Sequence, residues 1–321
     1  MFSMLAFAAA IEPLRVANRM IRREIYAWRV VSDGGAAVAC SNGTAVEANA
    51  GLEDLPRDAS IVVCSGLELD RAATKPVLTW LRKQSRRGVS IGAVCTGADL
   101  LARAGLLDGK RCAIHWENHA AFIETYPEIE ISNLIYCVED GIFTCAGGTA
   151  STDMMLHLIA QEQGSDLGSL IADALIHPNV RSETNEQRLS VPARIGVRHP
   201  KLVTVIQTME QSTEEPVSPS ELAKSVNMST RQLERLFRRY LNRSPKRYYM
   251  ELRLEKARNL LLQTNLSVIN VALACGFTSP SHFSKCYRAH FNRTPYRERG
   301  GPAESGAKSR AALTGAAPGI A

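Results

Sequence analysis

Cys95 stands where the sequence pattern would place a reactive side chain. An apolar run at 89–94 predicts a buried strand, and Cys95-Thr96-Gly97 connects it to a helical pattern at 98–104. At a strand-to-helix elbow, backbone N–H groups and a helix N-terminus surround the side chain, which lowers the pKa of a thiol and makes it nucleophilic. The other interpretations are a ligand-pocket wall and a small residue packed in a tight turn. Residue type alone favours these two equally, and both over catalysis.

His115 and Trp116 follow the next predicted strand, at 111–114, and could form a site with Cys95. An imidazole near the thiol could act as a general base, although a lone histidine more often packs or binds a ligand. The indole of Trp116 is the nearest candidate for the aromatic wall that a quaternary ammonium ligand favours. These residues predict a small-molecule pocket with Cys95 in its wall.

The segment 218–299 contains one sequence pattern that occurs twice. Five residues of the first copy match five of the second at a constant offset: Leu233, Phe237, Asn242, Arg243 and Pro245 match Phe283, Tyr287, Asn292, Arg293 and Pro295. A repeated unit indicates a repeated task. Each copy predicts a short helix, a tight turn and a second helix, which is the layout of a DNA-reading helix-turn-helix.

The second helix of each copy combines an apolar stripe with an outward polar face. The outward residues are Thr230, Arg231, Glu234, Arg235 and Arg238 in the first copy, and Pro280, Ser281, His282, Ser284, Lys285 and Arg288 in the second. Arginine and lysine can take guanine edges, while histidine and serine can bond bases or phosphates. One such helix is better explained as an ordinary amphipathic surface helix. Two of them, both after a tight turn, favour DNA binding.

The segment between the two copies predicts a rigid spacer. A helical pattern at 246–262 has 17 residues, which span about 26 Å at about 1.5 Å per residue. That length could separate the two reading helices by nearly one turn of DNA, which is about 34 Å.

The charge is divided unevenly along the chain. Residues 218–299 contain 16 Lys+Arg and 5 Asp+Glu, a net charge of +11, whereas the rest of the chain carries −5 of the total +6. This asymmetry predicts a polyanion-binding module attached to a mildly acidic domain with another task.

The elements that must position Cys95 and His115 alternate along residues 1–187. The expected strands lie at 27–32, 36–40, 60–64, 89–94, 111–114, 134–138 and 142–145, and the expected helices at 5–22, 75–87, 97–104, 117–125 and 149–163. This alternation predicts an α/β domain with a mainly parallel sheet. We expect a linker at 188–199, a helical DNA-binding domain at 200–299 and a disordered, Ala/Gly-rich tail at 300–321.

Several classes of protein are excluded by composition. No run of 18 apolar residues exists, which argues against a membrane span, and the apolar start has no basic region typical of a signal peptide. The eight cysteines form no Cys-x-x-Cys pair. They predict reduced thiols in a cytoplasmic protein, with no metal site and no cofactor.

Four motifs make residues 1–165 resemble the ThiJ/PfpI, or class I amidotransferase-like, domain. They are Ala93-Val-Cys-Thr-Gly-Ala98, Leu106-Leu-Asp-Gly-Lys110, Ala113-Ile-His-Trp116 and Thr144-Cys-Ala-Gly-Gly-Thr-Ala150. The resemblance implies a flavodoxin-like three-layer α/β sandwich with a ligand site at Cys95, Thr96, His115, Trp116 and Glu12. Catalytic members pair the cysteine with a histidine and an acidic residue after the first strand. Here Thr96 follows the cysteine, and 3–7 contains no carboxylate.

The same resemblance raises a question about the start of the chain. The family begins with an apolar strand, whereas this sequence starts at the turn that follows it. We expect either a start codon assigned too late or a truncated domain, and favour the first. Mass spectrometry of the native N-terminus would distinguish them.

Residues 200–297 resemble the DNA-binding domain of the AraC/XylS family. The signature runs through Ala272-x-x-Cys-Gly-Phe277 and Phe283-x-x-x-Tyr-Arg288 to Phe291-x-x-Thr-Pro295. An amidotransferase-like domain followed by this domain is similar to the GlxA-type regulators, which control the catabolism of small amines and amino acids. The resemblance implies a homodimeric transcriptional activator that binds promoter DNA, RNA polymerase and a small nitrogenous effector, such as an amino acid, betaine or carnitine-like amine. Alternatives are a cysteine hydrolase or amidase tethered to DNA, and a structural nucleoid-type binder with weak sequence preference.

Overall fold

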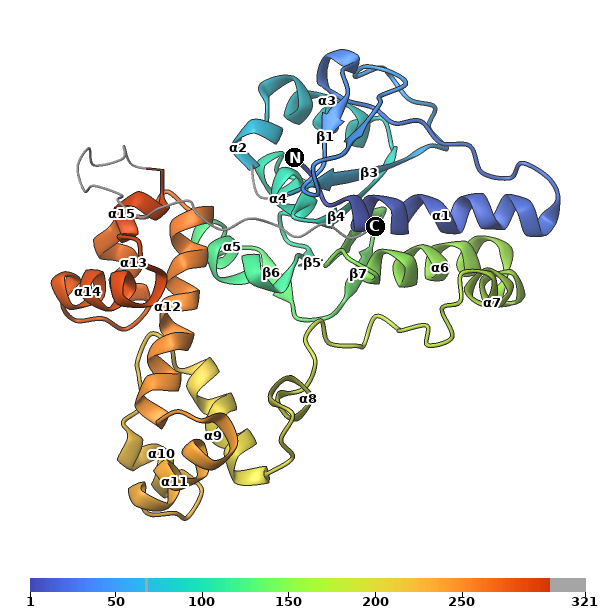
Figure 1. Cartoon of the computed structure of the whole chain (residues 1–321). Helices are drawn as coiled ribbons and strands as arrows, with labels where there is room; N and C mark the ends of the chain where they lie inside the picture. The colour runs from blue at the N-terminus through green and yellow to red at the C-terminus, as the bar shows by residue number, and fades with distance from the viewer. Residues whose placement is uncertain (67–68, 301–321) are drawn as a thin grey trace, which may run out of the picture.

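The computed structural model describes residues 1–66 and 69–300. Within them an α/β domain is followed by a separate group of helices, as Figure 1 shows. The expected tail at 300–321 lies, apart from Gly300, outside the described residues. None of the described helices is both long and apolar enough to span a bilayer.

The central sheet is mainly parallel, in the order β3-β4-β8-β7. β3 (Ser60–Ser65), β4 (Ser90–Cys95) and β8 (Ile142–Cys145) are parallel neighbours, and β7 (Tyr136–Glu139) runs antiparallel to β8. A turn with positive φ at both Asp140 and Gly141 joins β7 to β8 in a hairpin. Two small sheets pair β5 (Arg111–Ala113) with β6 (Glu130–Ser132), and β1 (Val38–Ala39) with β2 (Ala45–Val46).

Helices cover both faces of the sheet, because alternate residues of β4 point into two different cores. Ile91 and Ala93 pack with α3 (Lys75–Arg86) and α4 (Gly97–Arg103) on one face. Val94 packs with α1 (Met4–Ile21) and α6 (Ala150–Gln163) on the other. α7 (Ser165–Ala174) extends this second layer through a core shared with α1 and α6, and α2 (Leu69–Ala72) precedes α3. The predicted three-layer α/β sandwich is confirmed.

The segment at 27–32, predicted as a strand, forms only an isolated bridge between Val31 and Ala50. Its backbone pairs with a loop instead of a strand. The side chain of Asn49 accepts the N–H of Val30 at 3.0 Å, and the carbonyl of Val30 accepts the N–H of Asn49 at 2.7 Å. The predicted strand is therefore wrong, because a strand needs a continuous neighbour. A 3₁₀ turn, η1 (Asp33–Gly35), follows.

The second domain consists of short helices arranged around one long helix. It contains α8 (Val191–Ile195), α9 (Pro200–Gln211), α10 (Pro219–Ser225), α11 (Thr230–Leu241), α12 (Pro245–Gln263), α13 (Val268–Ala274), α14 (Pro280–Phe291) and α15 (Pro295–Glu298). One core gathers α9, α10, α11 and the first half of α12, and another gathers α13, α14 and its second half. The segment expected to be a linker, 188–199, contains α8, whose Val191 is buried in the first of these cores.

Candidate DNA-binding surface and ligand site

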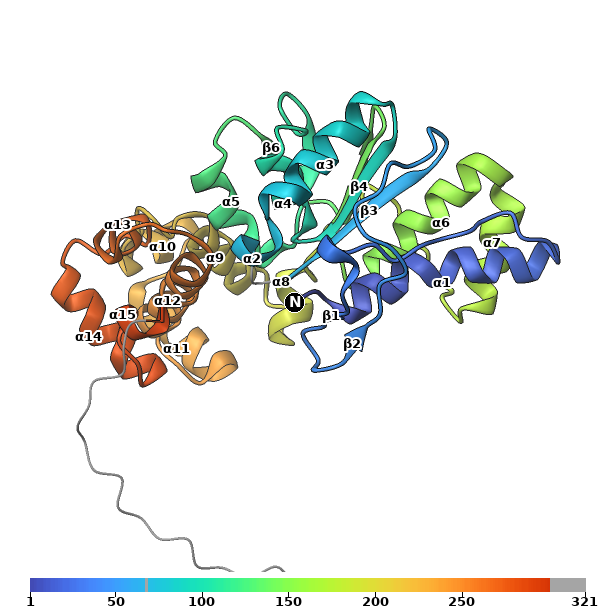
Figure 2. The ribbon, with the colours of Figure 1, turned by 90° about the horizontal axis from the view of Figure 1, so that it is seen from above.

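The two predicted reading helices, α11 and α14, lie at opposite ends of α12. In Figure 2 both are on the same side of α12, with α10 and α13 on the other side. α12 has 19 residues, so it separates them by about 28 Å at about 1.5 Å per residue. This is the arrangement expected of two helices that enter successive major grooves on one face of DNA.

The outward residues predicted from sequence lie at the surface. Exposed side chains are Thr230, Arg231, Glu234, Arg235 and Arg238 on α11, and Pro280, Ser281, His282, Lys285 and Arg288 on α14, while Ser284 is half-buried. The apolar sides bury Leu233 and Phe237 in one helix and Phe283 and Tyr287 in the other. Tyr240 of α11 is exposed, and the guanidinium of Arg239 lies 5.3 Å from its ring centroid.

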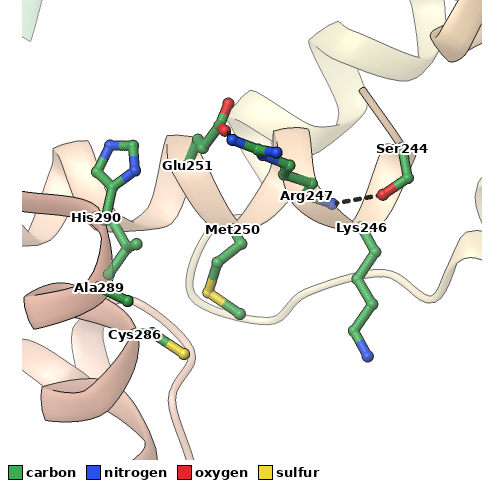
Figure 3. A pocket seen from close by; sticks show the side chains of 9 residues that line it. Ser244, Lys246, Arg247, Met250, Glu251, Cys286, Ala289 and His290 are labelled. Carbon is green, nitrogen blue, oxygen red and sulfur yellow. Dashed lines mark hydrogen bonds and ion pairs between the residues drawn. The ribbon is translucent and has the colours of Figure 1, made fainter. Parts of the chain in front are cut away.

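Two open grooves border α14. One, of about 570 Å³, is lined by the predicted residues Ser284, Lys285 and Arg288 together with Ala289 and Thr294. The other, of about 410 Å³, lies between α12 and α14, and Figure 3 shows Lys246 and His290 among the residues that line it. Basic side chains therefore extend beyond α11 and α14 onto the start of α12.

The contribution of α12 was missed by the sequence analysis, although a signal was present. Lys246 and Arg247 occupy the first turn of α12, which has no acidic residue. Cations there oppose the helix dipole, so the dipole does not explain why they occupy this turn. Ser244 caps this turn by accepting the N–H of Arg247 at 3.2 Å, and the guanidinium of Arg247 is held 3.0 Å from Glu251.

The turn before α14 is fixed to α12 by Arg253. Its guanidinium donates to the carbonyls of Cys275, at 2.7 Å, and Gly276, at 2.6 Å, and lies 4.2 Å from the ring centroid of Phe277. Gly276 has φ of +71°, and a Cβ there would meet the carbonyl oxygen of Glu214 at 2.6 Å. The turn therefore requires glycine for two reasons: the φ of this position is positive, and a Cβ would clash with the backbone of Glu214.

The predicted elbow at Cys95 is confirmed. Cys95 ends β4 with φ of 60°, a left-handed conformation that is costly for a non-glycine residue. Its backbone is crowded, because a Cβ on Gly147 would lie 2.8 Å from its Cα. Thr96 is buried and its hydroxyl donates to the carbonyl of Gly66 at 2.8 Å.

The thiol of Cys95 differs from the sequence-based expectation in its acidity. Burial raises its pKa, and the carboxylate of Glu117 acts in the same direction, whereas a hydrogen bond from the N–H of Thr96 opposes them. Helix termini and N–H groups lower a thiol pKa only where desolvation is small. Here desolvation dominates, so the neutral thiol is favoured.

The side chain of His115 caps the 3₁₀ turn that follows it. Within the described residues, Cys95 and His115 share no hydrogen bond; the Nδ1 atom of His115 instead accepts the N–H of Glu117 at 3.4 Å. Burial lowers the pKa of His115, against the influence of the Glu117 carboxylate 3.8 Å away. Glu117 is an acidic residue of the site that the sequence analysis did not select. Its position two residues after His115 was the available signal.

The remaining predicted ligand residues lie in different surroundings. Trp116 begins the 3₁₀ turn η2 (Trp116–Asn118), and its ring lies 5.8 Å from that of His115. Glu12 lies on α1, where it accepts two hydrogen bonds from the guanidinium of Arg15, and no contact with Cys95, His115 or Trp116 is found in the described part of the chain. The described residues also contain no group of three or more His, Cys, Asp or Glu that could hold a metal ion.

Comparison with known proteins finds a family match in each of the two domains. The model of a helix-turn-helix domain matches residues 222–300, and the DJ-1/PfpI family model matches residues 9–161. The HTH-type transcriptional regulator GbdR of Pseudomonas aeruginosa is 45% identical over 300 residues, covering 94% of this chain and 82% of GbdR. This chain belongs to the AraC-type transcriptional regulators of the GbdR and GlxA kind.

Two further matches have lower sequence identity. The regulator GlxA of Rhizobium meliloti is 38% identical over 299 residues, covering 92% of this chain and 91% of GlxA. A solved AraC family regulator from Pseudomonas putida is 27% identical and covers 54% of this chain and 94% of its own, with a TM-score of 0.48. The predicted family and DNA-binding regulatory role of this AraC-type chain are confirmed.

Proposed function

We propose that this regulator binds promoter DNA sequence-specifically through α11 and α14, and that its α/β domain senses a small nitrogenous metabolite. The observation that carries the DNA-binding half is the placement of two exposed basic faces on one side of α12. We assign sensing to residues 1–187 and DNA binding to 200–299, with 188–199 as the connection between them.

The finer parts of the proposal follow from the family resemblance. The protein acts as a cytoplasmic homodimeric activator, and the bound effector changes its contact with RNA polymerase. All eight cysteines are free, which suits a reducing compartment. The effector belongs to the class of amino acids, betaines and carnitine-like amines, and it binds near Cys95 and His115.

Footprinting of the full chain tests the DNA-binding half. Arg231→Ala should lower affinity for a discrete operator by about 1–3 kcal/mol, as loss of one base-reading arginine does. Arg86→Ala removes the same charge from an exposed site on α3 and should change affinity little. Smeared protection without a discrete site would support a nucleoid-type binder instead.

A thermal-shift screen of amines and amino acids tests the sensing half, because a ligand that binds the folded state raises the melting temperature. Cys95→Ala should leave ligand-dependent transcription largely intact. The second candidate function, a tethered cysteine hydrolase or amidase, draws on the strained elbow at Cys95. Turnover of amides by purified protein, lost in Cys95→Ala, would establish that alternative.

A further inference from the structure

One arginine, Arg188, contacts both domains. Its guanidinium lies 4.4 Å from the ring centroid of Trp116 in the α/β domain. One of its nitrogens, Nη1, also lies 3.9 Å from Oε1 of Glu210 on α9. Arg188 therefore links the Trp116 ring to α9 of the DNA-binding domain.

The surroundings of this guanidinium are those of an organic-cation site. Tryptophan provides the strongest aromatic face for a cation. Glu117 is the next residue of η2, and its carboxylate opposes the lowering of the Arg188 pKa that burial causes. The same carboxylate acts on the thiol of Cys95. Trp116 is 37% exposed and the side chain of Arg188 is 38% exposed, so solutes can reach the ring.

Arg188 is held loosely at its other end. Glu210 is already paired with Arg194, whose guanidinium donates two hydrogen bonds to it at 2.7 and 2.8 Å. Arg194 repels Arg188, and burial further disfavours the Arg188 charge. If Arg188 leaves Trp116, the carboxylate of Glu210 therefore still has Arg194 as its partner.

Trp116 is also connected to the helix that carries both reading units. η2 continues into α5 (His119–Thr125), and both contact α12. Ala121 of α5 is buried in the core formed by Leu254, Ala257 and their neighbours. A change at the Trp116 ring thus reaches α12 through one turn of helix.

We propose that Trp116 and Glu117 form a subsite for the ammonium or guanidinium group of the effector, and that Arg188 occupies this subsite as an internal ligand in the effector-free protein. An effector cation takes the place of the Arg188 guanidinium on the ring and releases the tie between the α/β domain and α9. This inference rests on the proposed function, because it assigns a chemical class to the effector of the same site.

Calorimetric titration of the full chain with tetramethylammonium chloride and with methylguanidine hydrochloride tests the subsite, with potassium chloride as the ionic-strength control. Arg188→Gln should bind both cations about tenfold more tightly than the unmodified protein, because a competing cation–π contact is removed. Trp116→Leu should bind neither cation. Arg198→Gln removes the same charge from an exposed position in the same segment and should leave affinity unchanged.

Arg188→Lys restores a cation and should return the affinity to within about twofold of the unmodified value, which separates competition from a folding defect. Equal cation affinity in Arg188→Gln and the unmodified protein would overturn the inference. Failure of Arg188→Gln to bind tetramethylammonium or methylguanidine would overturn it too. Operator footprints of the same variants report on the proposed function separately. A discrete footprint together with a thermal shift by an uncharged metabolite would retain the function and reject the cation subsite.

Discussion

At Cys95, two features of the strand-to-helix turn have opposite effects on the pKa of the thiol. The turn directs the N–H of Thr96 at the sulfur, but the core around it removes water, and desolvation favours the neutral thiol. Sequence pattern predicted the turn correctly, since an apolar strand followed by Cys95-Thr96-Gly97 suffices for that. It left the acidity of the thiol open among three interpretations, because burial depends on how Gly147 and neighbouring segments pack.

Cys95 should therefore react slowly with iodoacetamide at pH 7. A raised pKa means that the thiolate appears only above the pH at which an ordinary thiol ionises, so the rate should rise at higher pH than for glutathione. Peptide mass spectrometry of the native protein measures this rate, with urea-unfolded protein as the control. Faster alkylation of the native than of the unfolded protein near pH 7 would contradict the prediction.

Asp153 on α6 is a second residue whose role depends on burial. Its fully buried carboxylate accepts hydrogen bonds from Nε2 of His177 at 2.8 Å, from the N–H of Arg181 at 2.8 Å and from the Arg181 guanidinium at 2.6 Å. The ion pair fastens the chain that follows α7 to α6. Nothing in the sequence spacing of these three residues indicates that they meet.

Asp153→Ala should destabilise the α/β domain by about 3–5 kcal/mol, because it leaves the Arg181 guanidinium partly buried without its carboxylate. The melting temperature of that domain, followed by circular dichroism, measures the loss. Asp166→Ala removes an exposed carboxylate from the first turn of α7 and should cost under about 1 kcal/mol. Similar losses in the two variants would show that Asp153 has no special structural role.

At the scale of elements, the sequence was most informative where a pattern is local. The helix-turn-helix units follow from apolar spacing, caps and turn residues, all within about a dozen positions. Ser218 and Glu221 form a capping box at the start of α10. The segments at 27–32 and 191–195 were misjudged, because one depends on pairing with Asn49 and the other on packing of Val191 against α9.

Gly276→Ala should destabilise the second helix-turn-helix by about 2–4 kcal/mol. Its positive φ costs about 1–2 kcal/mol for alanine, and the added Cβ would overlap Glu214 and Pro216, which adds strain. Gly196→Ala is the matched control: its φ is +68° but no atom lies within 4 Å of the added Cβ, so only the first cost applies. Thermal unfolding of both variants gives the difference, and equal losses would show that crowding at Gly276 contributes nothing.

At the scale of the whole molecule, the decisive contact is the one between α5 and α12. No sequence pattern indicates it, since Ala121 looks like any small residue on an amphipathic helix, yet it is only 6% exposed within the core of the other domain. The division of charge did predict which domain binds DNA. It could not predict where the domains meet.

Ala121→Glu should separate α5 from α12, because it places a charge in an apolar core. Operator binding should persist while its response to effector is lost, as measured by footprinting with and without ligand. Ile123→Glu introduces the same charge on the exposed side of α5 and should behave like the unmodified protein. Loss of operator binding in Ala121→Glu but not in Ile123→Glu would instead indicate that the α5 contact is needed for the DNA-binding domain to fold.

The position of that contact along α12 has a mechanical consequence. The core that receives Ala121 is built from the second half of the helix, at Leu254, Ala257 and Leu261, whereas α11 is attached to the first half. The contact with α5 therefore lies closer to the α14 end of α12 than to its α11 end. A tilt of α12 about its contact with α5 would move the α11 end farther than the α14 end, because α11 lies farther from that contact.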